Sequence, residues 1–152
     1  MRLNYLQILF MLMIMMLASV VLAQDWSTST TPFIGVWQGQ WSEPRGYVYE
    51  ARATFQVTNM RTFKGQINWV LLKSPRPEEQ SKLGLTGIEF VRVTYDSISR
   101  VLTLEGYDKM DPHYILGLDK YKLIVAENAE VIGGLTYNHG DWQGKFFLTR
   151  IK

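Results

Sequence analysis

The sequence contains no cysteine and only two histidines among its 152 residues. Without cysteine, the chain cannot form a disulfide, hold zinc through thiolates or use a thiol nucleophile. It also lacks the G-x-S-x-G, P-loop, H-E-x-x-H and G-x-G-x-x-G motifs of common hydrolase, nucleotide and metalloprotease sites. We therefore expect a non-enzymatic protein with no catalytic residues and no cofactor.

A strong excess of one charge is also missing. The formal net charge is +2, and Arg2 is the only charged residue in 1–23, which leaves 15 basic against 14 acidic residues in the rest of the chain. Recognition of a phosphate backbone depends on a concentrated basic surface. The near balance therefore predicts that nucleic acid is not a partner.

Long apolar runs are missing except at the N-terminus. The run 5–22 stops at Val21 and Ala23, whose modest size suits signal-peptidase cleavage before Gln24. We expect 1–23 to be a signal peptide and the mature chain, with no membrane span, to be periplasmic or secreted. An uncleaved anchor helix is the alternative, because the run approaches the length of a membrane span.

What the sequence does contain is period-two alternation. In 47–57, apolar residues occupy every second position, which is typical of a half-buried antiparallel strand. After a polar segment, 24–32, residues 33–152 are predicted to form an all-β domain, a single eight-stranded antiparallel up-and-down β-barrel. The expected strands are 33–41, 46–58, 62–73, 85–95, 100–107, 114–125, 130–137 and 142–151.

The connections predict two different rims. The turns after the second, fourth and sixth strands are short, whereas those after the third and fifth are longer. Alternate loops of an up-and-down barrel share one end, so the longer loops lie with 42–45 and 138–141. One rim is therefore expected to be tight and the other to carry the more varied loops.

The tripeptide Trp-Gln-Gly occurs twice, at 37–39 and 142–144, near both ends of the predicted barrel. We interpret the repeat as two neighbouring strands that close the sheet, with Trp142 facing inward like Phe146 and Arg150. Chance recurrence of a three-residue word is the alternative.

Gly35 and Trp37 form a Gly-x-Trp on the first strand, and Arg150 ends the last strand. In these features and in its eight strands the chain resembles the calycin superfamily of lipocalins, fatty-acid-binding proteins and avidins. The resemblance implies a lipocalin-like closed end in which Arg150 packs over Trp37. It extends to architecture only, because the ligand contacts of avidins cannot be matched residue by residue and no lipocalin-type disulfide is possible.

Inward aromatic residues toward the rim with long loops suggest a place for a small hydrophobic or amphipathic ligand. The alternative is that these rings only fill the core and that the barrel binds a protein through rim loops 42–45 and 74–82. The resemblance to calycins, some of which inhibit proteases, implies that a protease is one such partner. The predicted ligand-binding residues are Trp41, Tyr47, Tyr49, Phe55 and Trp69.

Charged residues at two positions of 85–95 are unexpected in a barrel strand. Glu89 shares a face with Val91 and Val93, whereas Arg92 lies on the other face. Either one charge points inward, where it can orient a ligand, or the glutamate reaches solvent at a strand end or bulge.

Both histidines have an aspartate two residues away, on loops predicted to share a rim. Two imidazoles and two carboxylates are adequate zinc ligands, and a metal-dependent enzyme is a further alternative. The same residues are ordinary turn formers, and no metal-hydrolase spacing is present, so we expect no metal site. The residues concerned are Asp111, His113, His139 and Asp141.

Overall fold

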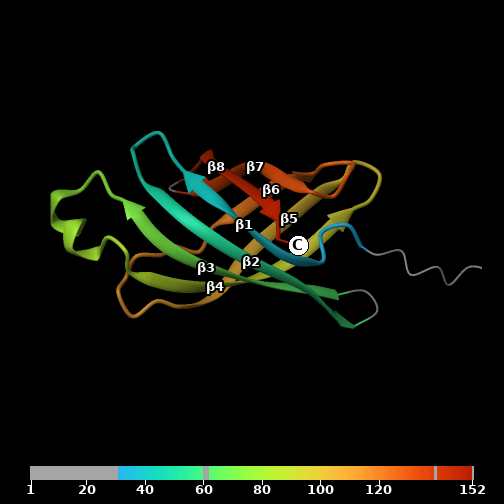
Figure 1. Ribbon diagram of the computed structural model, residues 1–152, viewed down its shortest axis with the longest axis horizontal. Helices are drawn as coiled ribbons and strands as arrows, with labels where there is room; N and C mark the ends of the chain where they lie inside the picture. Colours follow the sequence, from blue (N-terminus) through green and yellow to red (C-terminus); the bar gives the residue numbers. More distant parts are fainter. Residues whose placement is uncertain (1–30, 60–61, 139, 152) are drawn as a thin grey trace, which may run out of the picture. The chain divides into compact units, whose positions relative to one another are not determined.

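The computed structural model describes residues 31–59, 62–138 and 140–151, so the predicted signal peptide and His139 lie outside the described residues. Eight antiparallel strands follow one another around a closed barrel (Figure 1). The predicted all-β, up-and-down, eight-stranded barrel is therefore confirmed. The strands are β1 (Gly35–Ser42), β2 (Val48–Asn59), β3 (Thr62–Lys73), β4 (Thr86–Asp96), β5 (Val101–Met110), β6 (Lys120–Val125), β7 (Val131–Asn138) and β8 (Asp141–Arg150).

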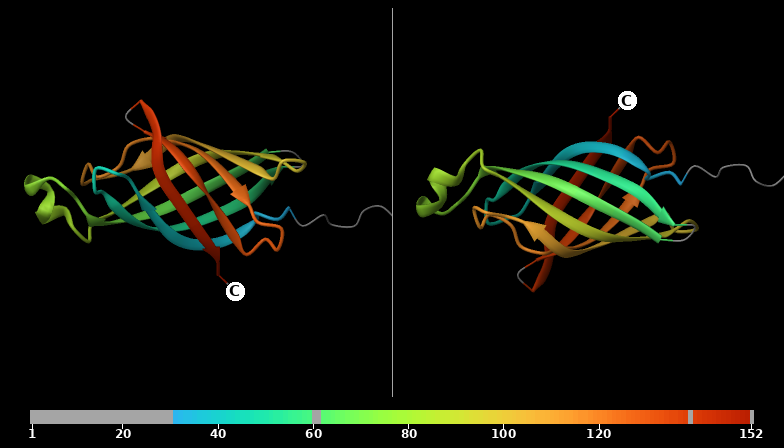
Figure 2. Two further views of the ribbon diagram at one scale, coloured as in Figure 1. Left: turned by 90° about the horizontal axis from the view of Figure 1, so that it is seen from above. Right: turned by 90° about the horizontal axis from the view of Figure 1, so that it is seen from below.

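Alternation of buried and exposed residues explains why these segments are strands. In β6, Tyr121, Leu123 and Val125 are buried, while the residues between them are exposed. The same period of two runs through the other strands, which cross the barrel obliquely (Figure 2). No helix in the described part of the chain is long and apolar enough to cross a membrane.

β1 and β8 pair without interruption from Trp37 opposite Arg150 to Ser42 opposite Lys145. The interpretation of the repeated tripeptide as two neighbouring strands is therefore correct. The inward orientation expected for Trp142 is wrong, because the ring is 44% exposed. A register shift between Thr136 and Tyr137 interrupts the alternation there, and the Trp142 ring packs 5.4 Å from that of Tyr137.

Arg150 seals one end of the barrel. Its guanidinium carbon lies 4.3 Å from the centre of the Trp37 ring. Its Nε and Nη1 donate to the carbonyls of Ala129 at 2.7 Å and Ile34 at 2.9 Å, and Nη2 donates to that of Pro32. Stacking and carbonyl acceptors together offset the cost of taking a cation out of water.

Gly35 makes room for this arginine. Its φ of +131° is strained for other residues, and a Cβ there would lie 2.9 Å from Nη1 of Arg150. Next to it, the Trp37 indole donates to the Phe33 carbonyl at 2.8 Å. The Phe33 ring then packs 5.0 Å from Phe63 and 6.1 Å from Phe55, so aromatic side chains fill this end.

The sixth strand is shorter than the expected 114–125, because residues 114–119 form a loop instead. The Asp111 carboxylate accepts hydrogen bonds from the backbone N–H groups of Ile115 at 3.0 Å and Leu116 at 2.8 Å. These contacts take the place of strand pairing and hold the loop at the opposite end of the barrel from Arg150.

Removal of the Trp37 ring tests the sealed end. Trp37 is fully buried, and its removal takes away the ring on which Arg150 stacks. Trp37→Ala should therefore lower the free energy of unfolding by about 3–5 kcal/mol. Urea denaturation measures this change. The exposed tryptophan provides the control: Trp142→Ala should cost far less, and an equal loss in both variants would contradict the assignment.

Candidate functional site

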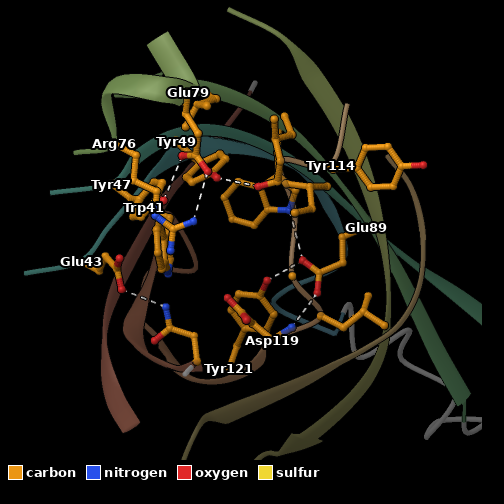
Figure 3. A pocket seen from close by; sticks show the side chains of 17 residues that line it. Trp41, Glu43, Tyr47, Tyr49, Arg76, Glu79, Glu89, Tyr114, Asp119 and Tyr121 are labelled. Carbon is orange, nitrogen blue, oxygen red and sulfur yellow. Dashed lines mark hydrogen bonds and ion pairs between the residues drawn. The ribbon is translucent and has the colours of Figure 1, made fainter. Parts of the chain in front are cut away.

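A cavity of about 450 Å³ opens at the barrel end opposite Arg150. The loops that follow β1, β3 and β5 contribute to its lining, together with Asn138 at the end of β7. The β3–β4 loop carries a short 3₁₀ helix, η1 (Pro77–Lys82). Figure 3 shows the residues around the opening. The lining consists of Trp41, Glu43, Tyr47, Tyr49, Trp69, Leu71, Arg76, Glu79, Glu89, Tyr114, Ile115, Leu116, Gly117, Leu118, Asp119, Tyr121 and Asn138.

Aromatic rings from several strands form the wall, and hydrogen bonds fix their orientation. The Trp41 indole donates to Oγ1 of Thr136 at 2.7 Å. The Tyr49 hydroxyl donates to the carbonyl of Ile115 at 2.6 Å, which ties the β5–β6 loop to β2. Burial, with the nearby charge of Glu79, raises the pKa of Tyr49, so this hydroxyl stays protonated as a donor.

Glu89 points into the barrel and is only 2% exposed. Its carboxylate accepts hydrogen bonds from the Trp69 indole at 3.1 Å, from the backbone N–H of Asp119 at 3.2 Å and from the Tyr121 hydroxyl. A Cβ at Gly106 would lie 2.2 Å from Oε1, so any other residue there would displace the Glu89 carboxylate.

Of the two charges considered in this strand, Glu89 is therefore the inward one. Arg92 faces outward, and its guanidinium carbon lies 4.8 Å from the centre of the Tyr107 ring.

Two carboxyl groups of the cavity hold protons unusually tightly. Burial raises the pKa of Glu89 to about 7, although the hydrogen bonds from Tyr121 and Asp119 oppose the rise. Burial and the negative charge of Glu43 raise the pKa of Asp119 to about 6. Both groups therefore lie in an environment that disfavours further negative charge.

Glu43 and Asn138 meet at another part of the wall. Oε2 of Glu43 accepts a hydrogen bond from Nδ2 of Asn138 at 3.2 Å. Each residue is 7% exposed, and the remaining oxygens, Oε1 of Glu43 and Oδ1 of Asn138, accept no hydrogen bond from the described residues. Figure 3 shows Glu43 and Glu89 on opposite sides of the cavity, with Asp119 and Tyr121 between them.

The rim is held by Glu79 on η1. Its carboxylate accepts hydrogen bonds from Ser74 at 2.6 Å and Tyr47 at 2.9 Å, and it pairs with Arg76 at 3.4 Å. The Ser74 hydrogen bond, with those other contacts, lowers the pKa of Glu79. This carboxylate is therefore ionised and fully engaged within the protein.

Four of the five predicted ligand-binding residues line the cavity: Trp41, Tyr47, Tyr49 and Trp69. Phe55 does not, because it lies on the same inward face but packs against Phe33 at the sealed end.

Sequence reasoning missed Glu43, Asp119, Tyr121 and Asn138 as lining residues. The alternation of apolar and polar residues in β6 was a signal from which the inward direction of Tyr121 could have been predicted. The two carboxylates lie just outside strands, where no periodicity marks the direction of a side chain.

The three described metal-site candidates, Asp111, His113 and Asp141, do not form a metal-binding group. Asp111 caps the β5–β6 loop, and the hydrogen bonds from Ile115, Leu116 and Lys109 outweigh burial and lower its pKa. His113 is exposed, Asp141 accepts a hydrogen bond from Gln143, and His139 lies outside the described residues. Within the described ranges, no three histidine, aspartate or glutamate side chains are arranged to hold a metal ion.

Comparison of the chain with protein-family models, with curated proteins and with solved structures finds no match. The geometry of the cavity is therefore the basis on which a function is proposed.

The raised pKa of Glu89 predicts a pH-dependent stability. Because the folded state binds this proton more tightly than the unfolded state does, its contribution is complete below the ordinary pKa of 4.5 and is lost as pH rises through about 7. The free energy of unfolding should fall by an amount on the order of 3 kcal/mol over that interval. Asp119 adds a loss of the same sign.

Urea unfolding across this pH interval measures the effect. Glu89→Gln cannot ionise, so it should remove the part of the decrease that Glu89 causes. Glu105→Gln, which changes a half-exposed carboxylate paired with Lys120, should retain the full decrease. A Glu89→Gln profile that parallels the unmodified protein would contradict the interpretation.

Proposed function

We propose that this protein is a non-enzymatic binding protein that holds one small amphipathic molecule in the open end of a calycin-like barrel. The observation that carries the proposal is the cavity of about 450 Å³, which is within the range of small-molecule sites. Aromatic faces from separate strands surround it, and polar groups are placed among them. An amphipathic guest matches this combination.

The rigidity of the wall supports binding. The donors of Trp41, Tyr49 and Trp69 are each held by a protein acceptor, so the rings are oriented before a ligand arrives. Trp69 and Tyr121 also pack against Phe146, at 5.1 Å and 5.6 Å between ring centres. A wall that is already ordered lowers the entropic cost of binding.

Export is part of the proposal. The apolar run 5–22 and the small residue Ala23 support a signal peptide and a periplasmic or secreted location. In such a compartment the barrel would take up its ligand from its surroundings, through the rim that carries the long loops.

Titration with the uncharged fluorophore N-phenyl-1-naphthylamine tests the proposal. The probe should bind with one-to-one stoichiometry and increased fluorescence. Gly117→Trp should weaken binding at least tenfold, because a Cβ at Gly117 lies 3.3 Å from Asp119 Oδ1 and a large side chain there blocks the cavity.

His113→Trp is the matched control. It adds the same ring to an exposed residue of the same loop that does not line the cavity. It should leave probe affinity within about twofold of the unmodified protein, and circular dichroism should show that both variants are folded. Absence of binding by the unmodified protein, or equal weakening in both variants, would overturn the proposal.

A further inference from the structure

Five of the six aromatic side chains that line the cavity direct their donors to protein acceptors: Trp41 to Thr136, Tyr47 to Glu79, Tyr49 to the Ile115 carbonyl, and Trp69 and Tyr121 to Glu89. The sixth, Tyr114, is 83% exposed at the rim. Arg76 has N–H groups beyond the one that pairs with Glu79, but its side chain is 57% exposed at the rim. Among the described residues, the deeper wall therefore has no ring donor left for a ligand.

Acceptors, in contrast, remain free. Oε1 of Glu43 and Oδ1 of Asn138 are buried and have no hydrogen-bond partner among residues 31–59, 62–138 and 140–151. The Asp119 carboxylate lines the same cavity and accepts no hydrogen bond from any described residue. A buried acceptor without a partner costs free energy, and a ligand that brings donors recovers it.

The charges of the cavity lining also favour a ligand that donates hydrogen bonds. Among the described lining residues there are four carboxyl groups, those of Glu43, Glu79, Glu89 and Asp119, and one guanidinium. Arg76 neutralises Glu79, and three donors satisfy Glu89. Arg45 lies 3.9 Å from Oε2 of Glu43, but it does not line the cavity, and it leaves Oε1 free. The residual charge of the lining is therefore negative.

We propose that the bound molecule is a small amphipathic amine, whose protonated ammonium group donates hydrogen bonds to Asp119 and Glu43 while its apolar part packs against Trp41 and Tyr49. This inference rests on the binding function proposed above. A primary ammonium has three donors and no acceptor, which complements a site with free acceptors.

Other ligand classes fit this lining less well. A carboxylate or phosphate would bring further negative charge next to Asp119, and like charges at short range oppose binding. A neutral alcohol offers one donor to several acceptors. An ammonium group also gains from the faces of Trp and Tyr rings, which attract cations.

Isothermal titration calorimetry with three probes of similar shape tests the inference: 2-phenylethylamine, 2-phenylethanol and 3-phenylpropanoate. The full-length protein at neutral pH should bind the amine at least tenfold more tightly than the alcohol, and the alcohol more tightly than the carboxylate. The three probes share a phenyl ring on a short chain, so the comparison reports on the head group.

Variants assign the preference to the two carboxylates. Asp119→Asn should reduce amine affinity at least tenfold and leave alcohol affinity within about threefold. Glu43→Gln, whose amide oxygen can still accept from Asn138, should act in the same direction and replaces Asp119→Asn if that variant does not fold. Glu78→Gln removes an exposed charge on η1 outside the lining and should leave amine affinity unchanged.

The outcomes separate this inference from the binding function itself. If the alcohol or N-phenyl-1-naphthylamine binds but the amine shows no advantage, the amine assignment is wrong and the binding function stands. If the amine advantage survives both carboxylate substitutions, or falls equally in Glu78→Gln, the proposed contacts are wrong. If none of the probes binds, both proposals fail.

Discussion

Pairing of β1 with β8 turns a row of hairpins into a barrel, and Arg150 fixes that pairing from inside. The arginine lies opposite Trp37 in the ladder, stacks on its ring and donates to carbonyls of segments before β1 and before β7. Removal of any one partner would leave a partly buried cation incompletely satisfied, which costs free energy. The register of the seam, and with it the position of every inward side chain along β1 and β8, therefore depends on this contact.

The two ends of the barrel handle buried charge in opposite ways. At the sealed end, one cation finds only neutral carbonyl acceptors and aromatic faces, and the space is filled. At the open end, carboxylates lie among aromatic rings and the space is not filled. Glu89 illustrates the second arrangement, since its three donors hold it in place while burial keeps its pKa near neutrality.

Much of this arrangement can be read from the sequence, because alternation specifies the face of a strand on which a residue lies. Alternation places Gly35, Trp37 and Arg150 on inward faces, although their contact was expected from the resemblance to calycins and not from alternation. Alternation does not specify depth along the barrel axis, so Phe55 shares a face with Tyr49 yet packs at the sealed end. The register shift beside Trp142 breaks the alternation, so the direction of that side chain was predicted wrongly. Alternation also gives no information in loops, where tertiary contacts alone position Asp119.

The order of strands has a consequence for chain elongation. Each strand from β2 to β7 pairs only with its neighbours in sequence, whereas closure joins partners such as Arg150 and Ile34, which are 116 residues apart. Long-range closure carries the largest entropic cost of loop formation and comes late in folding. Because Trp41 reaches Thr136 across β8, the cavity wall cannot be completed on a nascent chain whose last strand is still inside the ribosome. The cavity is therefore completed only after β8 has paired with both β1 and β7.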